Sequence, residues 1–451
     1  MKLPFGVDRK TLREAFRMAW PSVLESFFVA FAGIVDSYMV SSLGAYAVAA
    51  VGLTTQPKFL ALALFIATNV AVSALTARRK GEEDRDGANR VLVNALMFTA
   101  VAGIIVSILC VALADPIIQF SGSKADTHAS AVLYFRIIMG GMIFNIISLV
   151  INAAMRGVGN TKIAMKTNVI SNTVNIIFNY LLIDGHFGFP ALGITGAALA
   201  TVLGTVIACA LSFRVLLKSD NYINLWYILK NKIGISIKAL RGIFKISSNV
   251  FVEQVLIRIG FMSVAVMAAH QGTQAYAAHQ VGMNIMSLSF SFGDGLQAAA
   301  VALIGQSLGA NNLKLAKKYG SACQMIGMTI ALCLSVLYMA GGRWLYTLFF
   351  EEPEIIEIGV NIMRITVIIV LFQVPQVIYM GCLRGAGDVR YTMIASSISV
   401  TGLRPLASYL LCYTAGLGIT GIWFGVVTDQ ISRFILTSVR FYSGKWINIK
   451  I

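Results

Sequence analysis

Long apolar segments alternate with short polar connections along the whole chain. Each apolar segment runs for about 20 residues or more, the length that an α-helix needs to cross the hydrocarbon core of a bilayer. This pattern predicts an all-α polytopic membrane protein, because every backbone polar group must be satisfied inside its own segment. Twelve transmembrane helices are expected, near residues 15–40, 46–77, 90–114, 131–155, 162–184, 192–216, 240–269, 275–308, 319–341, 358–383, 391–413 and 418–441.

The composition supports this prediction. Hydrophobic residues make up 57% of the 451 residues and charged residues only 12%, whereas a soluble domain carries roughly 25% charged residues. The net charge of +16 would suit a nucleic-acid-binding protein. The basic residues, however, flank apolar segments and do not form a stripe with interleaved aromatic residues, so we expect no nucleic-acid partner.

Lysine and arginine residues gather in alternate connections, and such an asymmetry marks the cytoplasmic side of a membrane protein. The opposite connections carry only Lys124 and Arg343. We therefore expect a multi-pass protein of the cytoplasmic (inner) cell membrane with both termini in the cytoplasm. The basic residues assigned to the cytoplasmic side are Lys2, Arg9, Lys10, Arg13, Arg17, Arg78, Arg79, Lys80, Arg85, Arg90, Arg156, Lys162, Lys166, Arg214, Lys218, Lys230, Lys232, Lys238, Arg241, Lys245, Lys314, Lys317, Lys318, Arg384, Arg390, Arg440, Lys445 and Lys450.

An internal repeat runs through the chain. MRGVGNTK at 155–162 recurs as LRGAGDVR at 383–390, an offset of 228 residues, and the same offset pairs Glu25 with Glu253. One constant offset in several separate regions predicts two parallel repeats of six helices each, with the substrate path between them.

The repeat also predicts the domain organisation. An N-terminal lobe is expected at 1–216 and a C-terminal lobe at 240–451, joined by a cytoplasmic linker at 217–239. The linker is basic and amphipathic, so it either lies along the membrane surface or acts as a flexible tether.

The motifs resemble those of the multidrug and toxic compound extrusion (MATE) family over essentially the whole chain. Pro21 is followed fifteen residues later by Asp36, and SSLGAYAVAAVG opens the next span. Further motifs are IGQSLGANNLKLAKK, the two RGxG segments and NIIFNYLLIDGHFGFPALGITGAALAT. The resemblance implies two lobes around a V-shaped cavity, and an antiporter that exports amphipathic, often cationic drugs or metabolites. It implies that inward H+ or Na+ drives export without another cofactor, and a monomer is expected.

Other classes stay open at this point. GEEDRDGANR at 81–90 resembles the glycine–aspartate–arginine loop of the major facilitator superfamily, but it is one residue short between Gly81 and Asp84. A lipid-linked oligosaccharide flippase would have a cationic cavity, whereas the candidates here are mostly acidic. A receptor or scaffold is disfavoured by paired repeats with acids inside the spans. No metal-ligand spacing joins the four histidines and no nucleophile lies beside a base, so we do not expect an enzyme.

Carboxylates inside the predicted spans are the first candidates for a coupling site. An ionised carboxylate at the bilayer centre costs roughly 2.5–3.5 kcal/mol, so such residues usually face a cavity. Asp36 lies about 7.5 Å inside the outer end of its helix, in the apolar stretch FAGIVDSYMV. Glu25 and Glu253 lie about 12 Å from the cytoplasmic end of theirs. Apolar surroundings disfavour a charged carboxylate, and a carboxyl group that takes up a proton suits proton coupling.

The resemblance assigns roles in the first lobe. Asp36 matches the first-helix acid of the family, and Pro21 matches the proline whose helix bending is proposed as a conformational hinge. A second acid on the fifth helix is replaced by Asn179, with Asn175 one turn earlier. Both amides are expected to assist Asp36 by hydrogen bonding.

The resemblance is weaker in the second lobe. Glu253 matches an acid of a cation site, but the tenth-helix acid that partners it in the family is Gln373 here, which puts a Na+ site in doubt. Glu253 could instead form an ion pair with Arg258 or with a neighbouring helix. A Na+ ion would bind, if anywhere, at Asp36 or Glu253.

Four residues are candidates for the substrate cavity: Tyr38, Gln373, Asp294 and Tyr276. Asp294 falls in mid-span between two glycines, where it could line the cavity or bend its helix. Aromatic rings such as those of Tyr38 and Tyr276 suit cationic substrates, although lipid or core packing would explain them equally. The expected partners are therefore a small-molecule substrate and membrane lipid.

The last predicted helices carry three more charges inside the membrane. Asp429 and Arg433 are four residues apart, so we expect them to form a structural pair on one helix face. Arg404 receives no role from the sequence, although it could pair with one of the acids.

Overall fold

The computed structural model describes residues 7–449, which are almost entirely helical and contain no β-strand. The helices of the first half are α1 (Arg9–Ser41), α2 (Ala45–Gly81), α3 (Arg85–Ala112), α4 (Ala114–Phe120), α5 (His128–Gly140), α6 (Met142–Gly157), α7 (Thr161–Leu182), η2 (His186–Gly188), α8 (Ile194–Leu216) and α9 (Leu225–Lys230). Those of the second half are α10 (Ile237–Ala269), α11 (Thr273–Gly309), α12 (Leu313–Thr347), α13 (Pro353–Gly385), α14 (Val389–Ser396), η3 (Ser397–Leu403), α15 (Arg404–Tyr409), η4 (Leu410–Thr414), α16 (Gly418–Tyr442) and η5 (Lys445–Asn448).

Every predicted span coincides with a helix or a run of helical segments. In the described part of the chain, eight helices are long and apolar enough to cross a membrane, or nine if α5 and α6, which meet at a 45° bend, form one span. The other three predicted spans are α7, α16 and the run from α14 to η4. Both α7 and α16 carry polar side chains in mid-helix, among them Asn175, Asn179 and Asp429.

The run from α14 to η4 has an unusual backbone. Its segments η3 and η4 are π-helical, and the Arg404 N–H donates to the Ser399 carbonyl five residues earlier. The next residue, Pro405, has no N–H to continue the α-helical pattern. Such wide turns inside helices are frequent at functional sites.

The chain folds into two compact units, and the boundaries between them fall inside helices. Unit 1 contains α1 up to Ser26 and the chain from Ser248 onward, and unit 2 contains Phe27–Ser247. Helices α1 and α10 therefore each contribute to both units. The lobes predicted at 1–216 and 240–451 differ from the compact units in these two helices.

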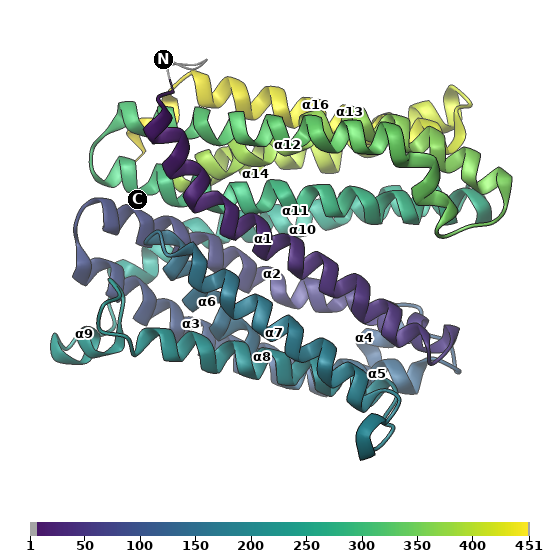
Figure 1. Ribbon diagram of the computed structural model, residues 1–451, viewed down its shortest axis with the longest axis horizontal. Coiled ribbons are helices and arrows are strands. Elements are labelled where there is room, and N and C mark those ends of the chain that lie inside the picture. Colours follow the sequence, from purple (N-terminus) through teal and green to yellow (C-terminus); the bar gives the residue numbers. More distant parts are fainter. Residues whose placement is uncertain (1–6, 450–451) are drawn as a thin grey trace. The chain divides into compact units, whose positions relative to one another are not determined.

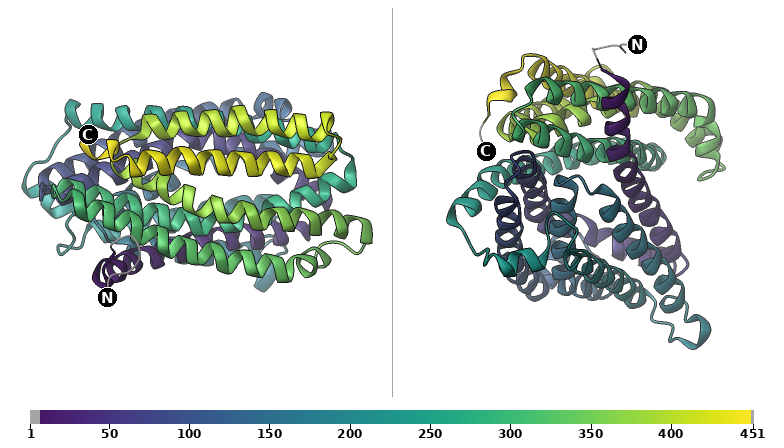
Figure 2. Two further views of the ribbon diagram at one scale, coloured as in Figure 1. Left: turned by 90° about the horizontal axis from the view of Figure 1, so that it is seen from above. Right: turned by 60° about the vertical axis from the view of Figure 1, so that its left-hand side comes forward.

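In unit 1, α13 lies between α11, α12 and α16 and packs against all three (Figure 1). The same neighbours stay adjacent in the two further views (Figure 2). Helix α13 is buried continuously from Gln373 to Gly385. The buried Tyr346 hydroxyl donates to the Ala278 carbonyl at 2.9 Å, which satisfies the polar tip of an otherwise apolar ring.

In unit 2, α2 packs against α3 and α6, and α7 packs against α8. A Cβ atom at Gly157 of α6 would clash with Thr76 and with the Ser73 carbonyl on α2. Small residues at such contacts let the backbones of membrane helices approach closely. The helix faces that remain exposed are largely apolar.

The connection between α8 and α10 is tied to unit 2. Arg85 donates from Nε to the Tyr222 carbonyl at 2.9 Å and from Nη2 to the Asn221 carbonyl at 3.1 Å. The Tyr227 hydroxyl donates to Asp86 Oδ1 at 2.7 Å. Of the two predicted alternatives, a surface segment or a flexible tether, these contacts favour an ordered segment against the α2–α3 connection.

Candidate functional site

The polar centre of unit 2 joins α1 and α7. Asp36 is half-buried on α1, and its Oδ1 accepts a hydrogen bond from Asn179 Nδ2. Asn179 is fully buried on α7, and Asn175 lies one turn earlier on the same helix. Asn175 Nδ2 is 3.4 Å from Thr201 Oγ1 on α8. Of the two amides predicted to assist Asp36, Asn179 therefore contacts the acid, whereas Asn175 contacts α8.

Two residues near Asp36 were not predicted from the sequence. Lys58 lies inside α2, is half-buried and interacts electrostatically with Asp36. The buried Tyr134 of α5 also interacts electrostatically with this carboxyl group. Lys58 could have been predicted as a site candidate from the sequence, because a lysine in the middle of an apolar span is as costly as an acid.

Unit 1 has its own buried carboxylate. Glu253 on α10 is fully buried, and its Oε1 lies 3.0 Å from Arg384 Nη2 and accepts a hydrogen bond from Ser396 Oγ at 2.6 Å. Arg384 belongs to the second RGxG segment, at the end of α13. The predicted ion-pair partners of Glu253 were Arg258 or a residue on a neighbouring helix, and the ion pair in the structure is with Arg384 on α13. The sequence did not indicate Arg384 as a partner of Glu253, because the RGxG segment was used only for the repeat, the topology and the family resemblance.

Two predicted cavity residues lie close to Arg384 or on its helix. Arg384 Nη1 donates to Gln297 Oε1 at 3.2 Å, and Gln297 Nε2 donates to Asp294 Oδ1 at 3.4 Å. Gln373 is buried on α13, and its Oε1 has no hydrogen-bond partner among residues 7–449. The structure therefore links Asp294, but not Gln373, to the polar centre around Glu253.

The remaining candidates lie on α1 and α11. Glu25 and Pro21 are buried in the part of α1 that belongs to unit 1, whereas Asp36 belongs to unit 2. Tyr38 is 78% exposed and Tyr276 is 38% exposed. Their exposure leaves both rings free to meet a substrate or lipid, and a role in the substrate cavity stays a prediction.

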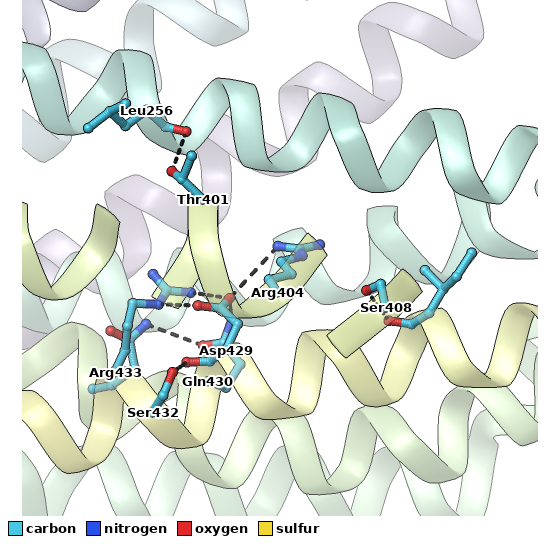
Figure 3. Close-up of polar contacts among 10 residues, drawn as sticks. Leu256, Thr401, Arg404, Ser408, Asp429, Gln430, Ser432 and Arg433 are labelled. Atoms are coloured by element: carbon cyan, nitrogen blue, oxygen red, sulfur yellow. Dashed lines mark hydrogen bonds and ion pairs between the residues drawn. The ribbon is translucent and has the colours of Figure 1, made fainter. Parts of the chain in front are cut away.

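The last helix holds the predicted pair. Arg433 Nε and Nη2 each lie 2.8 Å from an oxygen of Asp429, which is the bidentate geometry of a strong ion pair. Arg404 Nη1 lies 3.9 Å from Asp429 Oδ2, so Asp429 sits between two arginines (Figure 3). Within the described chain, no group of three or more His, Cys, Asp and Glu side chains is placed to hold a metal ion.

Buried carboxylates inside compact bundles of long apolar helices are typical of membrane transporters. The MatE family model matches residues 21–181 and again residues 250–410. These two matches cover well over half of the chain, so the protein belongs to the MATE family of multidrug efflux transporters and not to the major facilitator superfamily. The two matches have equal length and confirm the internal repeat.

Individual relatives agree with this assignment. The chain is 26% identical to the probable multidrug resistance protein NorM of Thermotoga maritima, over 96% of this chain and 93% of that protein. It is 27% identical to the uncharacterized transporter YisQ of Bacillus subtilis, over 96% and 94%. A solved structure described as the outward-facing conformation of a multidrug resistance MATE family transporter of the MOP superfamily has a TM-score of 0.89, with 22% identity over 99% of this chain and 100% of the other. The two-lobe MATE fold predicted from the sequence is therefore confirmed.

Proposed function

We propose that the protein is an antiporter of the cytoplasmic membrane that exchanges inward H+ for amphipathic, often cationic drugs or metabolites. The observation that carries this proposal is the half-buried carboxyl group of Asp36, inside a membrane helix and hydrogen-bonded to Asn179. Both termini are placed in the cytoplasm by the distribution of lysine and arginine.

The surroundings of the two acids favour H+ over Na+. Hard cations need several oxygen ligands, whereas Asp36 accepts a hydrogen bond from the amide N–H of Asn179 and interacts electrostatically with Lys58. Glu253 already has a cationic partner in Arg384. Asp36 is therefore the coupling site in this proposal, and Glu253 and Glu25 have accessory roles.

The transport cycle follows from the change of charge at Asp36. When the carboxyl group takes up a proton, it loses its attraction for Lys58 and for a cationic substrate, and Asn179 and Asn175 rearrange with it. Substrate affinity then falls and release outside is favoured. Pro21 serves as the hinge of α1, and Tyr38, Tyr276, Gln373 and Asp294 contact the substrate in this scheme.

Efflux from proteoliposomes under an imposed pH or Na+ gradient tests the proposal. Asp36→Asn should abolish gradient-driven export, whereas Asp126→Asn, a change at an exposed acid of the same unit, should not. Lys58→Met should reduce coupling to H+ while leaving the protein folded. Full export by Asp36→Asn, or wild-type export driven by Na+ alone, would contradict the assignment of Asp36 as a proton site.

A further inference from the structure

Arg404 lies at the centre of a second buried site in unit 1. Its side chain is 0% exposed, although arginine is almost never fully buried without partners. Its guanidinium carbon lies 4.2 Å from the centre of the Phe261 ring on α10. The wide π-helical turn of η3 ends at this residue, and the Thr401 hydroxyl fixes that turn to α10 through the Leu256 carbonyl at 2.8 Å (Figure 3).

The nearest acid does not satisfy Arg404. Both oxygens of Asp429 accept hydrogen bonds from Arg433, and Gln430 Nε2 also donates to Oδ2 at 3.2 Å. The distance of 3.9 Å from Arg404 Nη1 to Asp429 is an ion pair but is too long for a hydrogen bond. None of the three guanidinium nitrogens of Arg404 has a hydrogen-bond partner in the described chain.

Two further buried side chains of unit 1 also lack hydrogen-bond partners in the described chain. Trp423 is 0% exposed and His279 is 3% exposed, with their ring centres 5.5 Å apart. Neither Trp423 Nε1 nor His279 Nδ1 has a hydrogen-bond partner within residues 7–449. Arg404 also interacts electrostatically with His279. The indole N–H can only donate, as can every N–H of arginine.

The charges of this cluster do not balance. Arg404 and Arg433 carry two positive charges against the single negative charge of Asp429, and all three side chains are buried. An unpaired buried charge is strongly unfavourable, and unsatisfied buried groups in native proteins usually mark a bound ion, a water or a functional site. The excess charge is positive and the unsatisfied groups are mainly donors, and an anion complements both properties.

We propose that Arg404, Trp423 and His279 form a binding site for a monovalent anion, either free chloride or the carboxylate group of a substrate. A guanidinium group and an indole N–H can each donate hydrogen bonds to such an anion. The site lies in unit 1, separate from Asp36 in unit 2. Binding of chloride does not depend on the proposed export activity, whereas binding of a substrate carboxylate rests on it.

Anion-dependent stability of the purified full-length protein tests the site directly. Chloride is titrated against a bulky sulfonate anion at constant ionic strength, and the melting temperature is recorded. A ligand that binds only the folded state raises the melting temperature, here by about 1–3 °C. Arg404→Met should lose this increase, and Arg364→Met, at an exposed arginine of the same unit, should keep it.

Trp423→Phe keeps the proposal testable if Arg404→Met fails to fold. It removes only the indole N–H and leaves the Asp429–Arg433 pair intact, so chloride affinity should fall several-fold while the fold persists. Chloride should also change the fluorescence of Trp423, seen as the difference between wild type and Trp423→Phe. An equal chloride response in wild type and Arg404→Met would show that Arg404 is only a structural partner of Asp429, and no response in wild type would exclude free chloride as the ligand.

Export of a matched pair of dyes distinguishes the two anion sources. Tetramethylrhodamine carries a carboxylate and its methyl ester does not. If the site binds the carboxylate of the substrate, Arg404→Met should reduce export of the acid at least tenfold more than export of the ester. If it binds chloride, export of both dyes should fall together and require chloride. Failure of the wild type to export either dye would contradict the proposed function, while the chloride-dependent melting would still decide the anion site.

Discussion

Replacing Arg384 with methionine should leave Glu253 as a buried carboxylate without its guanidinium partner. Glu253 is 0% exposed, and its Oε1 lies 3.0 Å from Arg384 Nη2. Removing one partner of a buried ion pair costs about 3–5 kcal/mol, because the other charge remains away from water. The lost hydrogen bond from Arg384 to Gln297 adds about 1 kcal/mol. We expect Arg384→Met to lower the free energy of unfolding by about 4–6 kcal/mol.

The double variant provides the sharper test. Glu253→Gln keeps an acceptor for the Ser396 hydroxyl but leaves Arg384 with an uncompensated charge, so it should cost about 2–4 kcal/mol. The variant carrying both Glu253→Gln and Arg384→Met removes both charges. Replacing a whole buried pair by neutral groups is often close to neutral, so the double variant should be more stable than Arg384→Met alone.

Unfolding of the four proteins in mixed micelles, followed by circular dichroism, gives the interaction energy as a double-mutant cycle. The expected interaction energy is about 2 kcal/mol or more. Strictly additive losses would refute the reasoning, because they would mean that Glu253 and Arg384 are stabilised independently. Hydrogen-bonding of Glu253 by Ser396 alone would then explain its burial.

Two further outcomes follow from local geometry. A Cβ at Gly282 would lie 2.7 Å from both Ile362 Cγ2 and Trp423 Cζ2, so Gly282→Val should lower the free energy of unfolding by about 1–3 kcal/mol through overpacking. A Cβ at Gly341 meets nothing within 4 Å, so the control Gly341→Val should lower it far less. Thermal unfolding measures both. The hydrogen bond to the Asp86 carboxylate raises the pKa of Tyr227, so this contact stabilises the linker at neutral pH and is lost as the pH rises through the raised value. The difference between the near-ultraviolet titrations of wild type and Tyr227→Phe should show a midpoint above the ordinary tyrosine pKa of about 10. In the Asp86→Asn background that midpoint should move down. An unchanged midpoint would contradict the contact.

The sequence was sufficient for the parts of the fold that depend on segment length and repetition. Each apolar segment became a helix, because a chain in lipid has no other way to satisfy its backbone. The hydrogen bond between Asp36 and Asn179 was also predictable, since each residue matches a position of the family that the resemblance places in the first lobe. The coupling role of this pair stays a prediction.

Other features depend on which helices pack together, and the hydrophobic pattern does not encode this. Lys58 was overlooked because a single cation hardly changes the mean hydropathy of a long apolar segment. Arg384 was recognised as part of a repeat, but its contact with Glu253 depends on how α13 packs against α10. The π-helical segments η3 and η4, before and after α15, likewise depend on tertiary packing around Pro405. No local sequence pattern predicts them.

The division of α1 and α10 between the two units has a mechanical consequence. A helix is stiff along its axis, and each of these two helices is continuous, with one end in unit 1 and the other end in unit 2. The segment that joins α8 to α10 is hydrogen-bonded to unit 2 through Arg85. Flexibility of this segment therefore does not help one unit to move relative to the other. Any reorientation must be absorbed by bending at the crossing points near Ser26 and Ser248. Substitutions that stiffen or loosen these two short stretches should change the rate of transport without touching either acid.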